Sequence, residues 1–124
     1  MIYVDTHVLL WLLSERQLLS DAAQSILRSA DRVHYSPMVE LELQYLHEIG
    51  RIREDAALVL THLRAGLDLQ VCPHPFVDVV AAAKHLTWTR DPFDRLITAQ
   101  ATITDATLLT ADTNIRTHYA RAVW

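Results

Sequence analysis

Short apolar runs alternate along the chain with longer segments in which apolar residues recur at helical spacing, and this alternation predicts the elements of the fold. Strands are predicted at residues 2–4, 32–35, 67–72, 106–112 and 121–124. Helices are predicted at residues 6–13, 20–30, 36–52, 54–66, 76–86, 91–104 and 113–120. Ser20 and Ser36 are expected to cap two of these helices, and Pro37 fits a first helical position.

Short apolar strands separated by helices favour an α/β sandwich with a mainly parallel central sheet. The length of 124 residues suits a single domain that spans residues 1–124. In such sheets, ligands bind beyond the carboxyl ends of the strands. Asp5 and Asp112 both lie at predicted strand ends, so parallel strands would bring these two acids to the same edge. Each also has a structural interpretation, Asp5 as a helix cap and Asp112 as a turn residue or cap.

Helical periodicity separates two glutamates in the segment that begins at Pro37. Counted at about 100° per residue, Glu42 lies within about 40° of Met38 and Leu46, at the centre of the apolar face. Glu40 lies about 160° away, on the polar face. We therefore expect Glu42 to be buried. A buried carboxylate is costly unless it is protonated, paired with an arginine or bound to a metal.

The segment RDPFDRLITAQA, residues 90–101, carries two aspartates around a Pro-Phe pair. With Pro92 as the first helical residue, Asp91 becomes the N-cap and Asp94 the third helical residue. The cap accounts for Asp91. It accounts less well for Asp94, because the short aspartate side chain reaches back poorly to the cap. We expect Asp94 to lie at the buried mouth of a centrally packed helix.

The composition narrows the function classes. The formal net charge is −4, which argues against a protein that only coats nucleic acid but is compatible with a nuclease. Cys72 is the single cysteine, so a reducing compartment is indicated. The N-terminal stretch carries no basic leader, and the longest apolar run, residues 8–13, is too short to span a membrane. We expect a cytoplasmic protein.

Four acids are candidates for one metal site: Asp5, Glu42, Asp94 and Asp112. If their carboxylates converged without basic partners, they would repel one another unless some were protonated or a cation neutralised them. Donors that are all oxygen suit a hard ion such as Mg²⁺ or Mn²⁺. The seven histidines form no zinc-binding pattern. Acidic sites of this kind mostly serve phosphoryl transfer.

Several other side chains are candidates for supporting roles. Arg95 and Arg116 follow the two later acids and could meet a phosphate at the rim of the site. Arg95 could equally pair with a buried acid. His7 is close to the first acid, but a surface or core role is expected for it. Trp11 and Trp124 are expected to pack against other residues or to lie at an interface.

Four segments in this order, YVDTHVLLWLL, SPMVELELQYLHEIGRI, RDPFDRLITAQA and ATLLTAD, resemble PIN-domain ribonucleases, and among these the VapC toxins of VapBC toxin–antitoxin modules. The resemblance covers essentially the whole chain. It implies a PIN-like α/β/α sandwich and an endoribonuclease that depends on Mg²⁺ or Mn²⁺. It also implies RNA as the substrate, inhibition by a cognate VapB-like antitoxin, and a homodimer.

The resemblance also assigns residues. The acids of the family fall on Asp5, Glu42, Asp94 and Asp112. Small polar positions near the family's site fall on Thr6 and Thr110, which are candidates for contacts that support the acids. In this interpretation water attacks the RNA phosphodiester in line, and no side chain serves as the nucleophile.

Two alternatives stay open at the level of sequence. A binding module could use the acidic pocket mainly to capture a basic antitoxin segment, with little catalysis. A phosphohydrolase could use Asp5 as an aspartyl nucleophile. The second alternative fits less well, because that class of enzyme requires another aspartate two residues further on, where this chain has His7.

Overall fold

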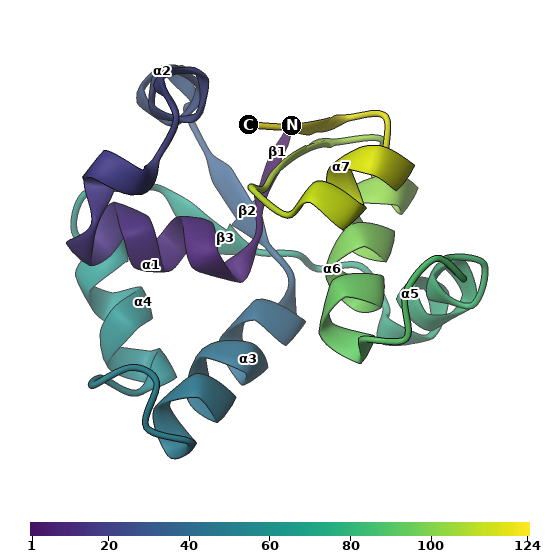
Figure 1. Cartoon of the computed structure of the whole chain (residues 1–124), viewed down its shortest axis with the longest axis horizontal. Helices are drawn as coiled ribbons and strands as arrows, with labels where there is room; N and C mark the ends of the chain where they lie inside the picture. Colours follow the sequence, from purple (N-terminus) through teal and green to yellow (C-terminus); the bar gives the residue numbers. More distant parts are fainter.

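The computed structural model describes residues 1–124, and every strand and helix predicted from the sequence is present in it (Figure 1). The strands are β1 (Ile2–Val4), β2 (Val33–Tyr35), β3 (Leu69–Val71), β4 (Thr107–Leu109) and β5 (Ala122–Val123). The helices are α1 (Thr6–Ser14), α2 (Asp21–Ser29), α3 (Pro37–Glu48), α4 (Ala56–Arg64), α5 (Phe76–Ala83), α6 (Pro92–Ile103) and α7 (Thr113–His118). One turn of 3-10 helix, η1 (Arg16–Leu18), was not predicted.

The five strands form one sheet in the order β3-β2-β1-β4-β5, and every neighbouring pair is parallel. The expected parallel sheet is therefore confirmed, and even the short edge strand β5 runs in the common direction. In the central pairing, Val4 of β1 is in register with Leu109 of β4. The next residues along, Asp5 and Thr110, consequently lie side by side at the carboxyl edge of the sheet.

Helices cover both faces of the sheet, as Figure 1 shows. On one side α1, α3 and α4 pack together, and on the other α5 packs along α6. The main core joins fully buried side chains of the strands, such as Val4 and Leu108, to those of the helices, such as Leu9 and Leu43. Contacts between α3 and α6 bring the helices that carry Glu42 and Asp94 together. No helix is long and apolar enough to cross a membrane.

Side-chain caps set where the helices begin. Ser20 and Ser36 accept hydrogen bonds from backbone N–H groups in the first turns of α2 and α3, as predicted. At the start of α6, Asp91 accepts hydrogen bonds from the amides of Phe93 and Asp94. Different roles were predicted for Asp91 and Asp94, and this prediction is confirmed in one respect. Asp91 is the cap of α6, and Asp94 lies within its first turn.

Truncation of the core beneath the carboxyl edge should destabilise the protein. Leu108 in β4 is fully buried, so Leu108→Ala leaves a cavity and should lower the free energy of unfolding by about 2–5 kcal/mol. Urea denaturation followed by circular dichroism measures the change. Leu41→Ala is the control, because Leu41 is 55% exposed and its truncation should cost no more than about 0.5 kcal/mol. Equal losses in the two variants would contradict this assignment of the core.

Candidate active site

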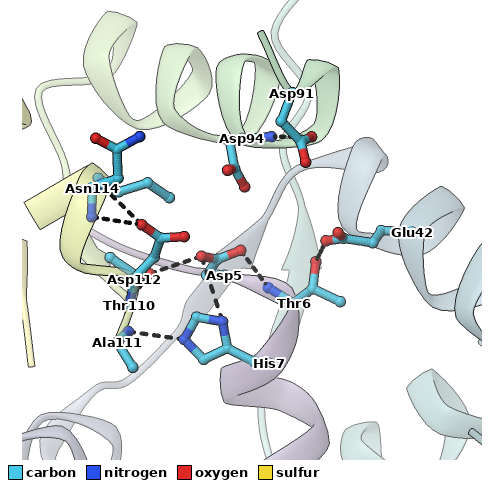
Figure 2. A network of polar contacts seen from close by, with 11 residues as sticks. Asp5, Thr6, His7, Glu42, Asp91, Asp94, Thr110, Ala111, Asp112 and Asn114 are labelled. Atoms are coloured by element: carbon cyan, nitrogen blue, oxygen red, sulfur yellow. Dashed lines mark hydrogen bonds and ion pairs between the residues drawn. The ribbon is translucent and has the colours of Figure 1, made fainter. Parts of the chain in front are cut away.

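Asp5 lies at the centre of the carboxyl edge and is almost fully buried, with 4% of its surface exposed. Its Oδ1 atom accepts a 2.8 Å hydrogen bond from the backbone N–H of Thr6, which makes it the N-cap of α1. Its Oδ2 atom accepts a 2.8 Å hydrogen bond from the hydroxyl of Thr110 (Figure 2). Asp5 therefore has the structural role of a cap while its carboxylate faces the other acids.

Glu42 reaches the site from α3. The hydroxyl of Thr6 donates a short hydrogen bond to Glu42 Oε1, which links the second acid to the residue after the first (Figure 2). The pKa of Glu42 is raised above its ordinary value, mainly by burial. The hydrogen bond from Thr6 opposes this shift, and the negative charges of Asp5 and Asp91 add to it.

The expectation that Glu42 is at the centre of a buried face is corrected by the structure. Glu42 is half-buried, and Val39 and Leu43 are the buried residues of α3. Tyr45 and Ile49, two further apolar residues of the same segment, are 47% and 50% exposed. The buried face is set by the helices that α3 packs against, and the apolar stripe alone did not reveal its direction. Glu42 thus lies at the border of the core, where its carboxylate can face the site.

Asp94 extends from the first turn of α6 toward Asp5, as Figure 2 shows. Its carboxylate accepts no hydrogen bond from another residue, and the side chain is half-buried. The pKa of Asp94 is raised to about 7, first by burial and then by the negative charges of the neighbouring acids, among which Asp91 and Asp5 act most strongly. Near neutral pH the protein therefore holds a carboxylate that is costly to ionise without a nearby positive charge.

Asp112 completes the group from the turn that follows β4. Its Oδ1 atom accepts hydrogen bonds from the amides of Asn114 and Ile115 at 2.8 and 3.0 Å, so Asp112 caps α7. Its own amide donates a 3.0 Å hydrogen bond to the hydroxyl of Thr110, which in turn donates to Asp5. Asp112, like Asp5, is therefore both a helix cap and one of the four acids at the carboxyl edge of the sheet, which we call the acidic edge.

The donor set fits a hard divalent cation in its chemistry. The four carboxylates come from different parts of the fold and face one region in Figure 2, and the charges of Asp5, Asp112 and Glu42 add to the burial that raises the pKa of Asp94. A cation there would relieve that repulsion, and Mg²⁺ and Mn²⁺ prefer oxygen ligands of this kind. As the side chains stand, no group of three or more His, Cys, Asp or Glu residues is arranged to hold a metal ion. Binding would therefore require the carboxylates to turn toward a common point.

The two arginines differ in their surroundings. The guanidinium of Arg95 donates hydrogen bonds to the carbonyl oxygens of Ala83 and Lys84, and so caps the C-terminal end of α5. The sequence suggested a phosphate or a buried acid as the partner of Arg95. Its guanidinium instead contacts these carbonyl oxygens, because α5 packs against α6. Arg116 is exposed on α7, one turn beyond Asp112.

His7 was underestimated from the sequence. Its imidazole Nε2 atom accepts a 2.8 Å hydrogen bond from the amide of Ala111, and its Nδ1 atom lies 3.6 Å from Asp5 Oδ2. Its position two residues after Asp5, in the first turn of a helix that starts at the sheet edge, was the signal available. That signal was weak, because it does not reveal that the turn after β4 lies beside His7.

The main cavities of the molecule lie away from the acids. One of about 510 Å³ is an open cavity lined by residues of α1, α2 and α4 and of the segments that connect them to their neighbours, and one of about 660 Å³ lies beside β3. None of the four acids lines either cavity. The candidate site is therefore identified by its converging carboxylates and their hydrogen-bond partners.

The fold agrees with the comparisons to known proteins. The chain belongs to the PIN-domain family, whose model matches residues 2–120. Ribonuclease VapC22 of Mycobacterium tuberculosis is a similar protein, 33% identical over an alignment of 124 positions that covers 94% of this chain and 91% of that protein. The resemblance to VapC-type PIN-domain proteins, drawn from four sequence segments, is thus confirmed.

Solved structures of more distant proteins share the fold. VapBC2 from Rickettsia felis, bound to a promoter DNA fragment, matches with a TM-score of 0.63 and 20% identity over 90% of this chain and 88% of that chain. FitAcB from Neisseria gonorrhoeae matches with a TM-score of 0.57 and 20% identity over 93% of this chain and 90% of that chain. At this level of identity the likeness establishes the α/β fold with its central parallel sheet.

The raised pKa values predict how stability depends on pH in the presence of a chelator. A carboxylate whose pKa is higher in the folded than in the unfolded state stabilises the fold when protonated, at pH below about 4. That contribution is lost as the pH rises through about 7, the pKa of Asp94 in the folded protein. Asp94→Asn should therefore raise the free energy of unfolding by about 1 kcal/mol at pH 8, after allowance for solvent screening.

The measurement is urea denaturation of both proteins at a series of pH values with the chelator present. The difference between Asp94→Asn and the wild type should shrink steadily toward acid pH, where the wild-type carboxylate is protonated. A difference that is constant across the series, or a less stable variant at alkaline pH, would contradict the clustering of negative charge around Asp94.

Proposed function

We propose that the protein is an endoribonuclease toxin that depends on Mg²⁺ or Mn²⁺ and is neutralised by a cognate antitoxin. The observation that carries this proposal is the convergence of four carboxylates at the carboxyl edge of a PIN-domain sheet. Similarity to Ribonuclease VapC22, at 33% identity over nearly the whole chain, supports RNA as the substrate. RNA as the target is also consistent with the cytoplasmic location expected from the sequence.

In this proposal Asp5, Glu42, Asp94 and Asp112 hold the cation. When bound, the divalent ion polarises the phosphate, activates water and stabilises the leaving oxygen. Thr6 and Thr110 keep the carboxylates oriented, because each threonine hydroxyl donates a hydrogen bond to one of the acids. No side chain acts as a nucleophile in this proposal, and His7 occupies the position where an enzyme with an aspartyl nucleophile requires a second aspartate.

Arg116 is the arginine that we propose to contact an RNA phosphate. It lies exposed on α7, near the acid at the start of that helix, and no ion pair holds its guanidinium. Arg95 is the weaker candidate, since its guanidinium would have to leave three hydrogen bonds to carbonyl oxygens of α5 and the residue after it. From the sequence alone, either arginine could meet a phosphate.

A VapB-like antitoxin and a homodimer are the proposed protein partners. The support for an antitoxin comes from two solved assemblies that share this fold, the VapBC2 complex and the FitAB complex bound to IR36 DNA. The FitAB structure matches with a TM-score of 0.60 and 19% identity over 100% of this chain and 94% of that chain. The homodimer rests on the resemblance to VapC toxins.

Cleavage of RNA should require both the cation and Asp94. With a titration of Mg²⁺, the purified wild-type protein should cleave RNA, and Asp5→Asn and Asp94→Asn should each lose at least about 100-fold in rate. Both changes remove a negatively charged oxygen donor and keep the size of the side chain. Electrophoresis of a defined RNA mixture, with circular dichroism of each variant, gives the measurement.

Asp91→Ser is the matched control for the acid at the start of α6. Serine is also a good N-cap, so this variant should keep the helix start and most of the activity. If Asp91→Ser lost activity and Asp94→Asn retained it, the two aspartates would be wrongly assigned. If Asp5→Asn cleaved RNA as fast as the wild type, the acidic edge would be a binding surface for an antitoxin and not a catalytic site.

A further inference from the structure

His7 connects two segments that are far apart in the sequence. It lies in the first turn of α1, and its Nε2 atom accepts a 2.8 Å hydrogen bond from the amide of Ala111, in the turn after β4 (Figure 2). The residues on either side of Ala111 are Thr110, which donates to Asp5, and Asp112. The imidazole of His7 thus holds the turn that contains both Thr110 and Asp112. Thr110 supports Asp5, and Asp112 is the last of the four acids.

The hydrogen bond to Ala111 determines where the ring proton lies. An amide N–H can only donate, so the Nε2 atom carries no proton in this contact and the proton of the neutral ring is on Nδ1. That N–H faces Asp5 Oδ2 across 3.6 Å. A neutral ring leaves the negative charge of the carboxylate intact, whereas a lysine or arginine in this place would neutralise it and compete with a divalent cation.

Aromatic packing fixes the orientation of the imidazole. The ring centroid of Trp11, one turn further along α1, lies 4.8 Å from that of His7. Trp124, which follows β5, lies 6.0 Å away at an angle of 70°, and the two indoles pack edge to face at 5.5 Å. The side chain of His7 is only 27% exposed. Two indoles on one imidazole oppose its rotation away from Ala111.

We propose that His7 is a positioning residue, which fixes the turn of residues 110–112 against β1 and α1 so that the carboxylates of Asp5 and Asp112 are held for cation binding. It acts through the amide of Ala111. Without the acceptor, this amide and the Thr110 hydroxyl behind it lose their fixed place, although the strands stay paired. The consequence for cation binding rests on the proposed metal-dependent function, but the consequence for the turn does not.

The test compares the wild type with His7→Ala and His7→Gln. Glutamine can place its carbonyl oxygen near the position of Nε2 and accept from Ala111, whereas alanine offers no acceptor. His7→Ala should weaken Mn²⁺ binding by about 10- to 100-fold, and His7→Gln should keep most of the wild-type affinity. Calorimetric titration with Mn²⁺ alone measures the affinity. Hydrogen exchange of the Ala111 amide, measured by NMR with a chelator, should be faster in His7→Ala only.

The outcomes separate this role from simple structural support and from the proposed function. A folded His7→Ala protein with wild-type Mn²⁺ affinity and slow Ala111 exchange would overturn the role, as would a His7→Gln protein that resembles His7→Ala. The readouts here are Mn²⁺ affinity and amide exchange, so a protein that binds Mn²⁺ but fails the separate RNA cleavage assay would refute the proposed function and leave this role standing. If the wild type bound no Mn²⁺, the exchange of Ala111 would decide the role of His7.

The tautomer of the wild-type ring gives a check that needs no substitution. The ¹⁵N chemical shifts of the imidazole, recorded at about pH 8, distinguish a protonated ring nitrogen from an unprotonated one. We expect the proton on Nδ1. A proton on Nε2 would overturn the proposal, because that nitrogen could then not accept the hydrogen bond from Ala111.

Discussion

Repulsion between carboxylates is the constraint that shapes the carboxyl edge of this sheet. The fold places four acids there, and their supports within the site are neutral donors: the hydroxyls of Thr6 and Thr110 and backbone amides. Neutral donors orient a carboxylate without cancelling its charge, and so they preserve the attraction for a cation that paired arginines would remove. The parallel pairing of β1 with β4 brings the Thr110 hydroxyl to its acid, since it sets Asp5 beside Thr110.

The same constraint explains why the site costs stability. Asp94 has no hydrogen-bond donor of its own, and its pKa is raised first by burial and then by the neighbouring carboxylates, so its ionised form is unfavourable in the folded protein. Natural sites often retain such unfavourable groups because the function needs them. The acids that double as helix caps, Asp5 and Asp112, differ in this respect, because each gains hydrogen bonds from the helix that it starts.

Local signals in the sequence were enough to predict the strands, the helices and the two acids at strand ends. Apolar runs, serine and aspartate caps and Pro92 act over a few residues, so they can be read without knowing the fold. Glu42 and Arg95 show where such signals fail. The true buried face of α3 and the contact of Arg95 with α5 depend on which helices pack together. His7 was underestimated for the same reason, since its partner Ala111 is 104 residues away.

The long reach of these contacts has a consequence for biosynthesis. The hydrogen bond between Thr110 and Asp5 joins residues that are 105 positions apart, and β1 gains its neighbour β4 only after residues 107–109 have been synthesised. A growing polypeptide on the ribosome therefore carries the first two acids long before it can assemble the acidic edge. For a nuclease of the proposed kind, that order delays activity until residues 107–112 have been synthesised and have folded against β1, which leaves time for an inhibitor to be present first.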